Sequence, residues 1–158
     1  MSEANSEDLA GYFQLLSEEG SDVTNLRKLG LPVTLKDYEE KKTNLPTWLH
    51  ILVALEGKEV IGASTLTGAQ NLKLEDAAII ADLRVTSGHR RSGVGSELMR
   101  ATLDHAKTHG IVRAVAIVSE MNIAGVRLFQ KFGFKAYGVL KDFYDEGENA
   151  INFEKYLA

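Results

Sequence analysis

The sequence predicts a mixed α/β domain in which helices flank a central sheet. Three observations lead to this class. Segments with strand and helix character alternate from residue 77 to residue 133, a glycine-rich loop interrupts them, and further strand-like segments lie on either side. The chain has 158 residues, of which 44% are hydrophobic, so it can bury one full core. We therefore expect residues 1–158 to form a single domain.

Two helices and a hairpin are predicted in the N-terminal part. The segment "DLAGYFQLLSEEG", residues 8–20, places apolar residues at helical spacing and ends in a glycine. A second helix follows Thr34, in "LKDYEEKK". The strand-like residues 48–55 and 60–66 flank the short polar segment "EGKE" and therefore predict two strands joined by a tight turn. We expect a loop near residues 71–76.

The central segment predicts a pair of parallel strands. Residues 77–85, "AAIIADLRV", are apolar apart from two charged residues, and residues 111–118 have a similar character, so both read as buried strands. Between them a helix is expected from about Val94 to just before Gly110. The order strand, loop, helix, strand requires a crossover connection, which makes the two strands parallel.

The C-terminal part predicts one more helix and two more strands. The helix covers residues 124–132, and the strands cover residues 134–140 and 150–157. Between the strands, "KDFYDEGEN" is expected to be an acidic loop, most simply a solvated turn. If its carboxylates rim a binding pocket instead, they would favour a cationic ligand.

Composition and charge exclude several functional classes. The formal net charge of -4 argues against a general nucleic-acid binder, because phosphate neutralisation needs a basic surface. The chain has no cysteine, which excludes disulfides, thiolate metal ligands and a cysteine nucleophile. No apolar run reaches membrane-spanning length, and the polar, acidic N-terminus does not resemble a signal peptide. We expect a soluble, cytoplasmic protein that binds neither nucleic acid nor membrane.

The segment "HRRSGVGSELM", residues 89–99, predicts an anion-binding loop. Glycine lets backbone N–H groups approach a ligand closely, and the start of a helix leaves several N–H groups unpaired. Arg90 and Arg91 can add charge-assisted hydrogen bonds to phosphate oxygens. The alternative is a solvated, charged turn ahead of an ordinary helix.

Two familiar phosphate motifs fit this loop poorly. In a P-loop, a lysine and a hydroxyl residue would stand where Val94 and Gly95 lie, which argues against a nucleoside triphosphatase. A dinucleotide fingerprint needs its first glycine at the end of the strand and a third small residue where Leu98 stands. Glu120 nevertheless lies where a ribose-binding carboxylate would be expected, so this second interpretation stays open.

A third motif, R/Q-x-x-G-x-G/A, is matched in full by Arg90, Gly93 and Gly95. Here the chain resembles the GNAT superfamily of N-acetyltransferases. The resemblance covers roughly residues 48–157 through four ordered segments, "ADLRV", "HRRSGVG", "IVRAVAIVSEMN" and "LFQKFGF". It implies a GNAT-like acyl-CoA N-acyltransferase fold, with a central mixed, mostly antiparallel sheet that contains one splayed parallel strand pair and is flanked by helices.

The resemblance implies acetyl-coenzyme A as co-substrate. Backbone amides of residues 91–96 and the positive end of the helix would hold its pyrophosphate, and the splayed strand would offer main-chain groups to its pantetheine arm. Asn122 would hold the pantetheine or a water, although an asparagine there also suits a helix N-cap. The residues expected to bind the cofactor are Leu83, Arg84, Val85, Arg90, Arg91, Ser92, Gly93, Val94, Gly95, Ser96, Asn122 and Phe129.

The catalytic candidates are Asp82, Glu120 and Tyr137. Transfer needs a neutral amine, so a carboxylate must accept a proton, and the apolar neighbours of Asp82 should raise its pKa. Pairing with Arg84 is the structural alternative for Asp82, and capping a backbone N–H is that for Glu120. Many relatives carry a tyrosine proton donor where this chain has Phe129, so Tyr137, or else Tyr144, is the candidate substitute.

No metal site is predicted. His105 and His109 lie four residues apart on the central helix, but the glutamate of H-E-x-x-H is replaced by Ala106, and their place in the last turn suits the helix dipole. His50 is expected to serve packing.

The predicted function is transfer of the acetyl group of acetyl-coenzyme A directly to a primary amine within a ternary complex. The acceptor is expected to be a small molecule of the polyamine, amino acid or aminoglycoside type. One alternative is a protein lysine or N-terminal acetyltransferase. The other is a coenzyme A-binding regulatory module without catalytic activity, for which Phe129 is the main argument. Dimers are common in the superfamily, so a homodimer is compatible with this prediction.

Overall fold

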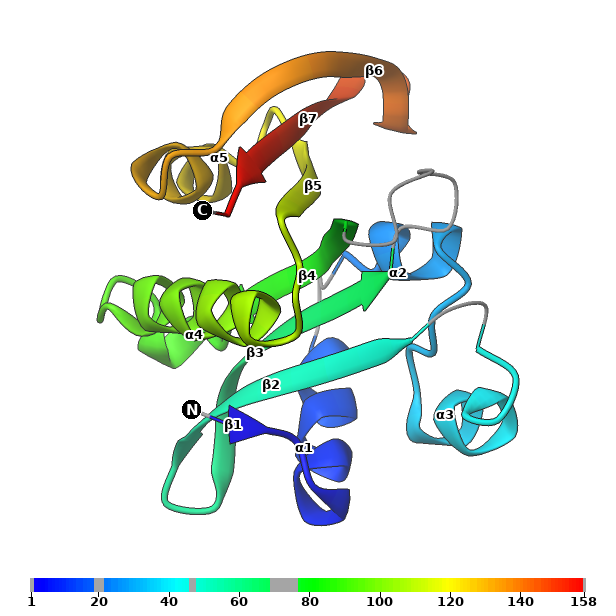
Figure 1. Ribbon diagram of the computed structural model, residues 1–158. Coiled ribbons are helices and arrows are strands. Elements are labelled where there is room, and N and C mark those ends of the chain that lie inside the picture. Colours follow the sequence, from blue (N-terminus) through cyan, green and yellow to red (C-terminus); the bar gives the residue numbers. More distant parts are fainter. Residues whose placement is uncertain (1, 19–21, 46–47, 69–76, 158) are drawn as a thin grey trace.

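The computed structural model describes residues 2–18, 22–45, 48–68 and 77–157 (Figure 1). The predicted loop near residues 71–76 lies outside this part of the chain. The strands are β1 (Ser2–Glu3), β2 (Leu49–Glu56), β3 (Glu59–Gly68), β4 (Ala77–Val85), β5 (Arg113–Ser119), β6 (Lys135–Asp145) and β7 (Glu148–Tyr156). The helices are α1 (Ser6–Leu16), α2 (Thr24–Lys28), α3 (Leu35–Lys41), α4 (Val94–Thr108) and α5 (Ile123–Lys131), with a 3-10 turn at Ser87–His89.

The strands form one sheet in the order β1-β2-β3-β4-β5-β7-β6. Every neighbouring pair is antiparallel except β4 and β5, which are parallel and connected through α4. The predicted mixed sheet with one parallel pair is therefore confirmed. The short strand β1 and the helix α2 were not predicted, because each is too short to show a hydrophobic period.

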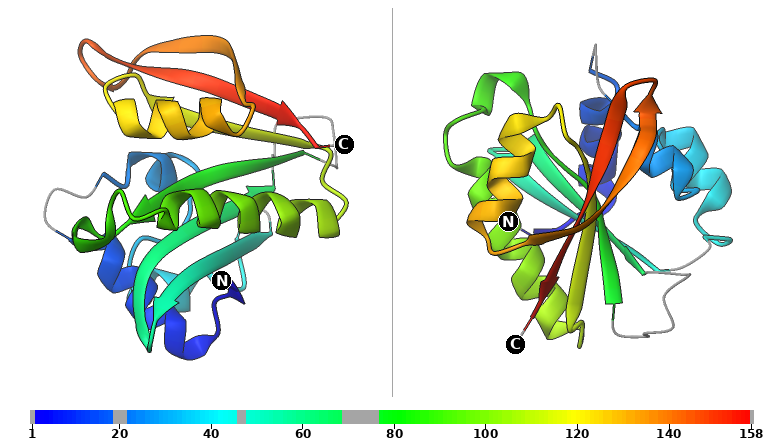
Figure 2. Two further views of the ribbon diagram at one scale, coloured as in Figure 1. Left: turned by 90° about the vertical axis from the view of Figure 1, so that its left-hand side faces the viewer. Right: turned by 90° about the horizontal axis from the view of Figure 1, so that it is seen from above.

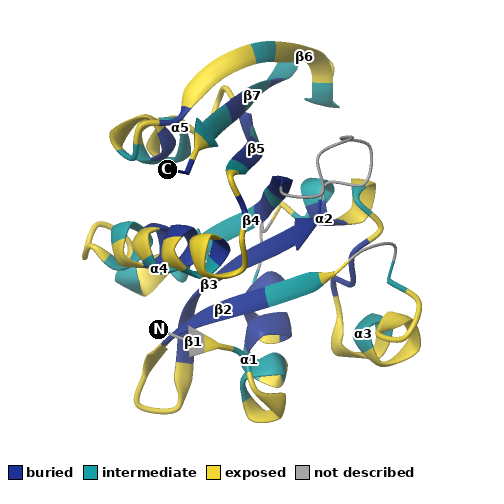
Figure 3. Ribbon diagram, in the orientation of Figure 1, coloured by how far each residue is buried: buried dark blue, intermediate teal, exposed yellow. Residues whose placement is uncertain are grey.

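Helices cover both faces of the sheet (Figure 2). Along β2, Ile51 and Val53 belong to the core that α1 closes with Tyr12 and Phe13, whereas Ala54 packs with Leu98 of α4. Successive side chains of a strand point to opposite faces, so this alternation places α1 and α4 on opposite sides. On α4 the sheet-facing side is buried and the outer side is exposed, whereas α3 has no buried residue (Figure 3).

A β-bulge parts β4 from β5. On β4, Asp82 pairs with Thr65 of β3 and Ile80 pairs with Leu66, so Ala81 is an extra residue in the ladder. A bulge of this kind bends its strand and increases the local twist. Parallel pairing with β5 ends at the same place, with Ile80 opposite Ala116, although β4 continues to Val85 and β5 to Ser119. The predicted splay of the parallel pair is confirmed.

The prediction of an acidic loop at residues 141–149 is wrong. β6 extends to Asp145 and β7 starts at Glu148, so the turn between them is short, with Gly147 in the left-handed region at φ 80°. Polar side chains hold this hairpin together: the Gly147 amide donates to Asp142 Oδ1 at 2.7 Å, and the Asp142 amide donates to Asn149 Oδ1 at 2.9 Å. The acidic composition of the segment predicted a solvated loop and gave no indication of these local side-chain-to-backbone hydrogen bonds.

Within the described residues, no helix has both the length and the apolar composition required to cross a lipid bilayer.

A buried hydrogen bond across the α1 side of the core gives a test of the packing. Tyr12 is 1% exposed, and its hydroxyl lies 2.8 Å from Thr65 Oγ1. Replacing Tyr12→Phe leaves the threonine hydroxyl without this partner and should lower the free energy of unfolding by about 1–3 kcal/mol, measured by urea denaturation. Adding Thr65→Val should recover most of this loss, because both partners are then apolar. A double variant that is as unstable as the two single losses combined would contradict the assignment.

Candidate functional site

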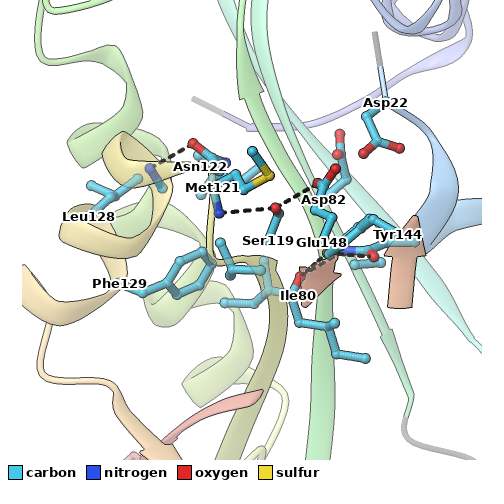
Figure 4. A pocket seen from close by; sticks show the side chains of 16 residues that line it. Asp22, Ile80, Asp82, Ser119, Met121, Asn122, Leu128, Phe129, Tyr144 and Glu148 are labelled. Atoms are coloured by element: carbon cyan, nitrogen blue, oxygen red, sulfur yellow. Dashed lines mark hydrogen bonds between the residues drawn. The ribbon is translucent and has the colours of Figure 1, made fainter. Parts of the chain in front are cut away.

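A cavity of about 380 Å³ opens where β4 and β5 part (Figure 4). Its walls come from both strands beyond their last pair, from the start of α5, from the β6–β7 hairpin and from the segment that leads into α2. Residues more than a hundred positions apart in the chain, such as Asp22 and Glu148, therefore line one space. The cavity exists because neither strand has a parallel partner there and the hairpin closes over the gap.

One wall carries an ion pair between Asp82 and Arg84 of β4. The two residues are both on β4, and Arg84 Nε donates to Asp82 Oδ2 at 2.6 Å while Nη2 donates to Oδ1 at 2.9 Å. Each side chain is 15% exposed. Burial raises the pKa of Asp82, and the hydrogen bonds and charge of Arg84 oppose this rise only in part. Asp82 is therefore paired with Arg84, which was the structural alternative, and its pKa is also raised, as predicted.

A second carboxylate faces the cavity from the start of β7. Ser119 Oγ, at the end of β5, donates to Glu148 Oε2 at 2.7 Å and accepts from the Met121 amide at 3.2 Å. This serine orients the Glu148 carboxylate and joins the hairpin to the end of β5. Asp22 and Asp82 also line the cavity, which therefore carries more negative than positive groups.

Tyr144 of β6 reaches the cavity floor. Its hydroxyl lies 3.0 Å from Asn25 Oδ1 and 3.2 Å from the Ile117 carbonyl oxygen, both of which are hydrogen-bond acceptors. Burial is the main cause that raises the pKa of Tyr144 to about 12, so the hydroxyl stays protonated at neutral pH. The register of β6 against β7 is irregular between Leu140 and Asp145, and Asp142 has φ 54°, which turns the end of β6 toward the cavity.

Asn122 caps α5 at the rim of the cavity. Its Oδ1 accepts from the Gly125 amide at 3.0 Å, so the N-cap alternative for this residue is observed. A Cβ atom added at Gly125 would lie 2.5 Å from Asn122 Nδ2, and glycine is therefore needed for the cap. Phe129, one helical turn further on, is buried between Phe134 and Phe153 and contributes an apolar ring to the cavity wall.

The glycine-rich loop follows β4 and leads into α4. Gly93 is the N-cap with φ 88°, and Arg91 also has a positive φ of 64°. Arg90 Nε donates to the Val85 carbonyl at 3.2 Å, which holds the arginine against the end of β4. Lys131 Nζ, from α5, donates to Ser96 Oγ at 3.1 Å and adds a cation beside the first turn of α4. The loop thus brings together cations and the unpaired amides of a helix start.

Gly95 connects this loop with the cavity. A Cβ atom added there would lie 3.7 Å from Leu128 Cδ2 and 3.8 Å from Val85 Cγ2, which are ordinary van der Waals contacts, so the fold itself would accept an alanine. Leu128 also lines the cavity. The space beside Gly95 is therefore the place where the loop and the cavity adjoin.

The structure brings some of the predicted site residues together and separates others. Asp82, Leu83, Asn122 and Phe129 line the cavity. Glu120 and Tyr137, which were predicted as catalytic residues, do not line the cavity. Glu120 is exposed, and only its backbone amide is engaged, with the Asn149 carbonyl at 3.0 Å.

Tyr137 lies outside the cavity, beside Arg113 at the start of β5, whereas Ile117 and Ser119 at the end of that strand line the cavity. Ala136 pairs with Phe153 and Gly138 with Asn152, so Tyr137 has no partner in β7. Its side chain is 50% exposed, and its ring lies 5.3 Å from the guanidinium of Arg113. The tyrosine of this hairpin that lines the cavity is Tyr144, the alternative that the sequence had left open.

Sequence reasoning missed Asp22, Asn25 and Ser119 as cavity residues. Glu148, which also lines the cavity, did have a signal, since it belongs to the acidic segment whose carboxylates, as the alternative to a solvated turn, could rim a binding pocket. Asp22 and Asn25 are common polar residues in segments without a motif, and tertiary packing alone places them here. Ser119 lies within the matched segment "IVRAVAIVSEMN", but nothing in that pattern singled it out.

Comparisons with known proteins agree with this geometry. The profile of the Acetyltransferase (GNAT) family matches residues 13–134. N-alpha-acetyltransferase 30 of Xenopus laevis is 26% identical over 161 residues, which cover 99% of this chain and 58% of that protein. Streptothricin acetyltransferase of Streptomyces lavendulae is 32% identical over 76 residues, which cover 46% of this chain and 40% of that protein. The chain thus matches less than two thirds of the length of either relative.

Among solved structures, an N-acetyltransferase from Staphylococcus aureus Mu50 superposes with a TM-score of 0.80 at 24% identity, covering 98% of this chain and 96% of that one. At this identity the likeness concerns the fold. The family profile covers most of the chain, and it includes both the parted strands and the glycine-rich loop. The chain belongs to the acetyltransferase (GNAT) family.

Proposed function

We propose that this chain transfers the acetyl group of acetyl-coenzyme A directly to a primary amine. One observation carries the proposal. Where β4 and β5 part, a cavity with carboxylates on its walls adjoins a glycine-rich helix start that has Arg90, Arg91 and Lys131 beside it. Such a cavity has room for a thioester and an amine side by side. Membership of the family supports acetyl-coenzyme A as the co-substrate.

The loop residues fit the diphosphate of coenzyme A. Amides of residues 91–96 would donate to its oxygens, and Arg90, Arg91 and Lys131 would supply positive charge. From there the pantetheine arm would pass Gly95 and run along Leu83–Val85, a stretch of β4 that has no strand partner on its β5 side. Asn122 would lie beside the arm near the thioester.

The reaction requires loss of two protons from the acceptor ammonium. One proton leaves before attack, so that the nitrogen lone pair can form the N–C bond with the thioester carbonyl carbon. The C–S bond then breaks, the thiolate of coenzyme A departs, and the second proton leaves the nitrogen as the amide forms. One proton ends on the thiolate and the other in solvent.

Asp82 is the proposed proton acceptor. A general base works best when its pKa lies near the working pH, and burial raises the pKa of this carboxyl group. Its charge is balanced by Arg84, whereas Glu148 has a serine rather than a cation as its partner. Glu148 would therefore attract the ammonium group of the acceptor, and Asp82 would take its proton.

Tyr144 is proposed to position the acceptor rather than to donate a proton. Its hydroxyl is already bound to Asn25 and to the Ile117 carbonyl, and burial raises its pKa to about 12, which makes it a poorer proton donor than an ordinary tyrosine. Phe129 offers no proton in the cavity wall either. The thiolate would accordingly receive its proton from the amine or from water.

The acceptor is proposed to be a small cationic amine with an apolar portion, which keeps it among the predicted small-molecule acceptors. A smaller cavity of about 190 Å³ shares Ile80, Ala81 and Ile117 with the main one and is lined further by Leu29 and Phe143. An apolar substituent would fit there while the amine faces Glu148. The names of the two relatives point both to N-terminal and to small-molecule acceptors, so a peptide N-terminus or lysine is the alternative.

Binding of the cofactor is tested at Gly95. Replacing Gly95→Val puts a branched side chain, larger than the glycine or alanine that the motif admits, where the diphosphate would lie, so the Kd for acetyl-coenzyme A should rise at least about tenfold, which corresponds to about 1.4 kcal/mol. Isothermal titration calorimetry measures this change. Gly88→Val is the matched control, since an added Cβ there meets nothing within 4 Å. Equal affinity in the two variants would refute the placement of the diphosphate.

The role of Asp82 is tested by the pH dependence of the rate. The parent should lose kcat/KM as the pH falls and the base becomes protonated, with its apparent pKa above the ordinary aspartate value. Asp82→Asn should lower kcat/KM by about 10²–10⁴-fold and remove this acid limb. Glu120→Gln, an exposed position outside the cavity, is the control and should behave like the parent. A profile of Asp82→Asn that overlays the parent would exclude Asp82 as the base.

The acceptor class is tested by thiol release. A panel of small amines, apolar amino acids, polyamines and aminoglycosides is compared with peptides that carry a free N-terminus or a lysine. We expect the highest kcat/KM with small amines that have an apolar part, and a rise in their KM on Glu148→Gln. Faster turnover of peptides would favour the protein acetyltransferase. Tight acetyl-coenzyme A binding without turnover of any amine would favour the regulatory module.

A further inference from the structure

Three histidines gather at a site remote from the cavity. His105 and His109 are one turn apart near the C-terminal end of α4, and His50 lies on β2, against which α4 packs. One ring nitrogen from each lies within 4.8 Å of those of the other two. Residues four apart on a helix share a face, so both α4 histidines can turn toward the same point.

The contacts around His50 bring several electron-pair donors to one place. Its Nδ1 lies 2.8 Å from Glu3 Oε1 and 2.9 Å from His105 Nε2. A ring nitrogen carries either one hydrogen or one lone pair, so Nδ1 of His50 has only one of these to offer to both Glu3 and His105. A cation at this point would satisfy the carboxylate and the imidazoles at once.

An outer contact orients the His109 ring as metal-binding histidines are oriented. His109 Nδ1 lies 2.9 Å from the His105 carbonyl oxygen, which can only accept, so Nδ1 carries the hydrogen and Nε2 keeps its lone pair. Metal ligands commonly donate their second ring N–H to a backbone carbonyl in this way.

We propose that His50, His105 and His109 bind a divalent transition-metal ion, with the Glu3 carboxylate as fourth ligand. Three imidazoles and one carboxylate are a donor set that Zn²⁺ accepts in tetrahedral geometry, with metal–nitrogen distances of about 2.0–2.1 Å. Nitrogen atoms around such an ion lie closer together than 4.8 Å, and the partly exposed rings can turn inward to reach it. The sequence did not indicate this site because the third histidine comes from a strand 55 residues away.

The site would fasten the sheet to α4. It joins β1 and β2 to the last turn of the helix whose first turn carries the glycine-rich loop. None of its four residues lines the cavity, so the ion would act on stability and not on the chemistry of acetyl transfer.

Metal titration of untagged, chelator-treated protein tests the proposal. Zn²⁺ titrated in a calorimeter should bind with one-to-one stoichiometry and raise the Tm of the parent. His109→Gln, at an exposed position, and His105→Gln should each weaken Zn²⁺ binding at least about tenfold and abolish the rise in Tm. His89→Gln is the matched control, because His89 is the remaining histidine of the chain and pairs with Glu56 elsewhere.

A second readout uses Trp48, the single tryptophan of the chain, whose ring centroid lies 5.2 Å from that of His50. Cu²⁺ bound at the site should quench its fluorescence and saturate at one equivalent in the parent and in His89→Gln. In His109→Gln the quenching should need at least about tenfold more Cu²⁺. Equal Zn²⁺ affinity and equal quenching in the parent and in His109→Gln would overturn the proposal, whatever the behaviour of His105→Gln.

Discussion

The parting of β4 from β5 is the constraint on which the rest of the structure depends. A parallel pair that continued to Val85 and Ser119 would leave no space between its strands, and their facing peptide groups would bind one another. The bulge at Ala81 bends β4 at the last parallel pair, so peptide groups beyond it are left for another partner. Under the proposed function, that partner is the pantetheine arm of acetyl-coenzyme A.

The hairpin β6–β7 completes the cavity that the parted strands open. Extra residues in β6 turn its end inward and bring Tyr144 to Asn25 and the Ile117 carbonyl. Glu148 accepts a hydrogen bond from the hydroxyl of Ser119. Each polar group on the cavity wall thus has a protein partner in addition to its access to a ligand. Such pairing keeps the carboxylates oriented and reduces the rearrangement that binding requires.

Helix α4 links two sites of different chemistry. Its first turn carries the positive end of the helix and the glycines, of which Gly93 is required by its own backbone conformation and Gly95 is not. A glycine that the fold does not need points to a ligand that approaches closely. Its last turn carries the two histidines that meet His50 on β2. A metal there would hold the helix against the sheet, far from the reacting atoms.

The sequence by itself determined the order of strand, loop, helix and strand and the parallel pair, because these follow from local period and from the length of the connection. Glycine spacing and residue chemistry also led from the sequence alone to the proposals of an anion-binding loop and of Asp82 as the base. Only the tertiary structure decided that Tyr144 and not Tyr137 faces the cavity, and that Glu120 lies outside. One extra residue in a strand changes which side chains face a given side, and register is set by pairing with distant strands. The same reason applies to the histidines, whose meeting depends on how α4 packs against β2.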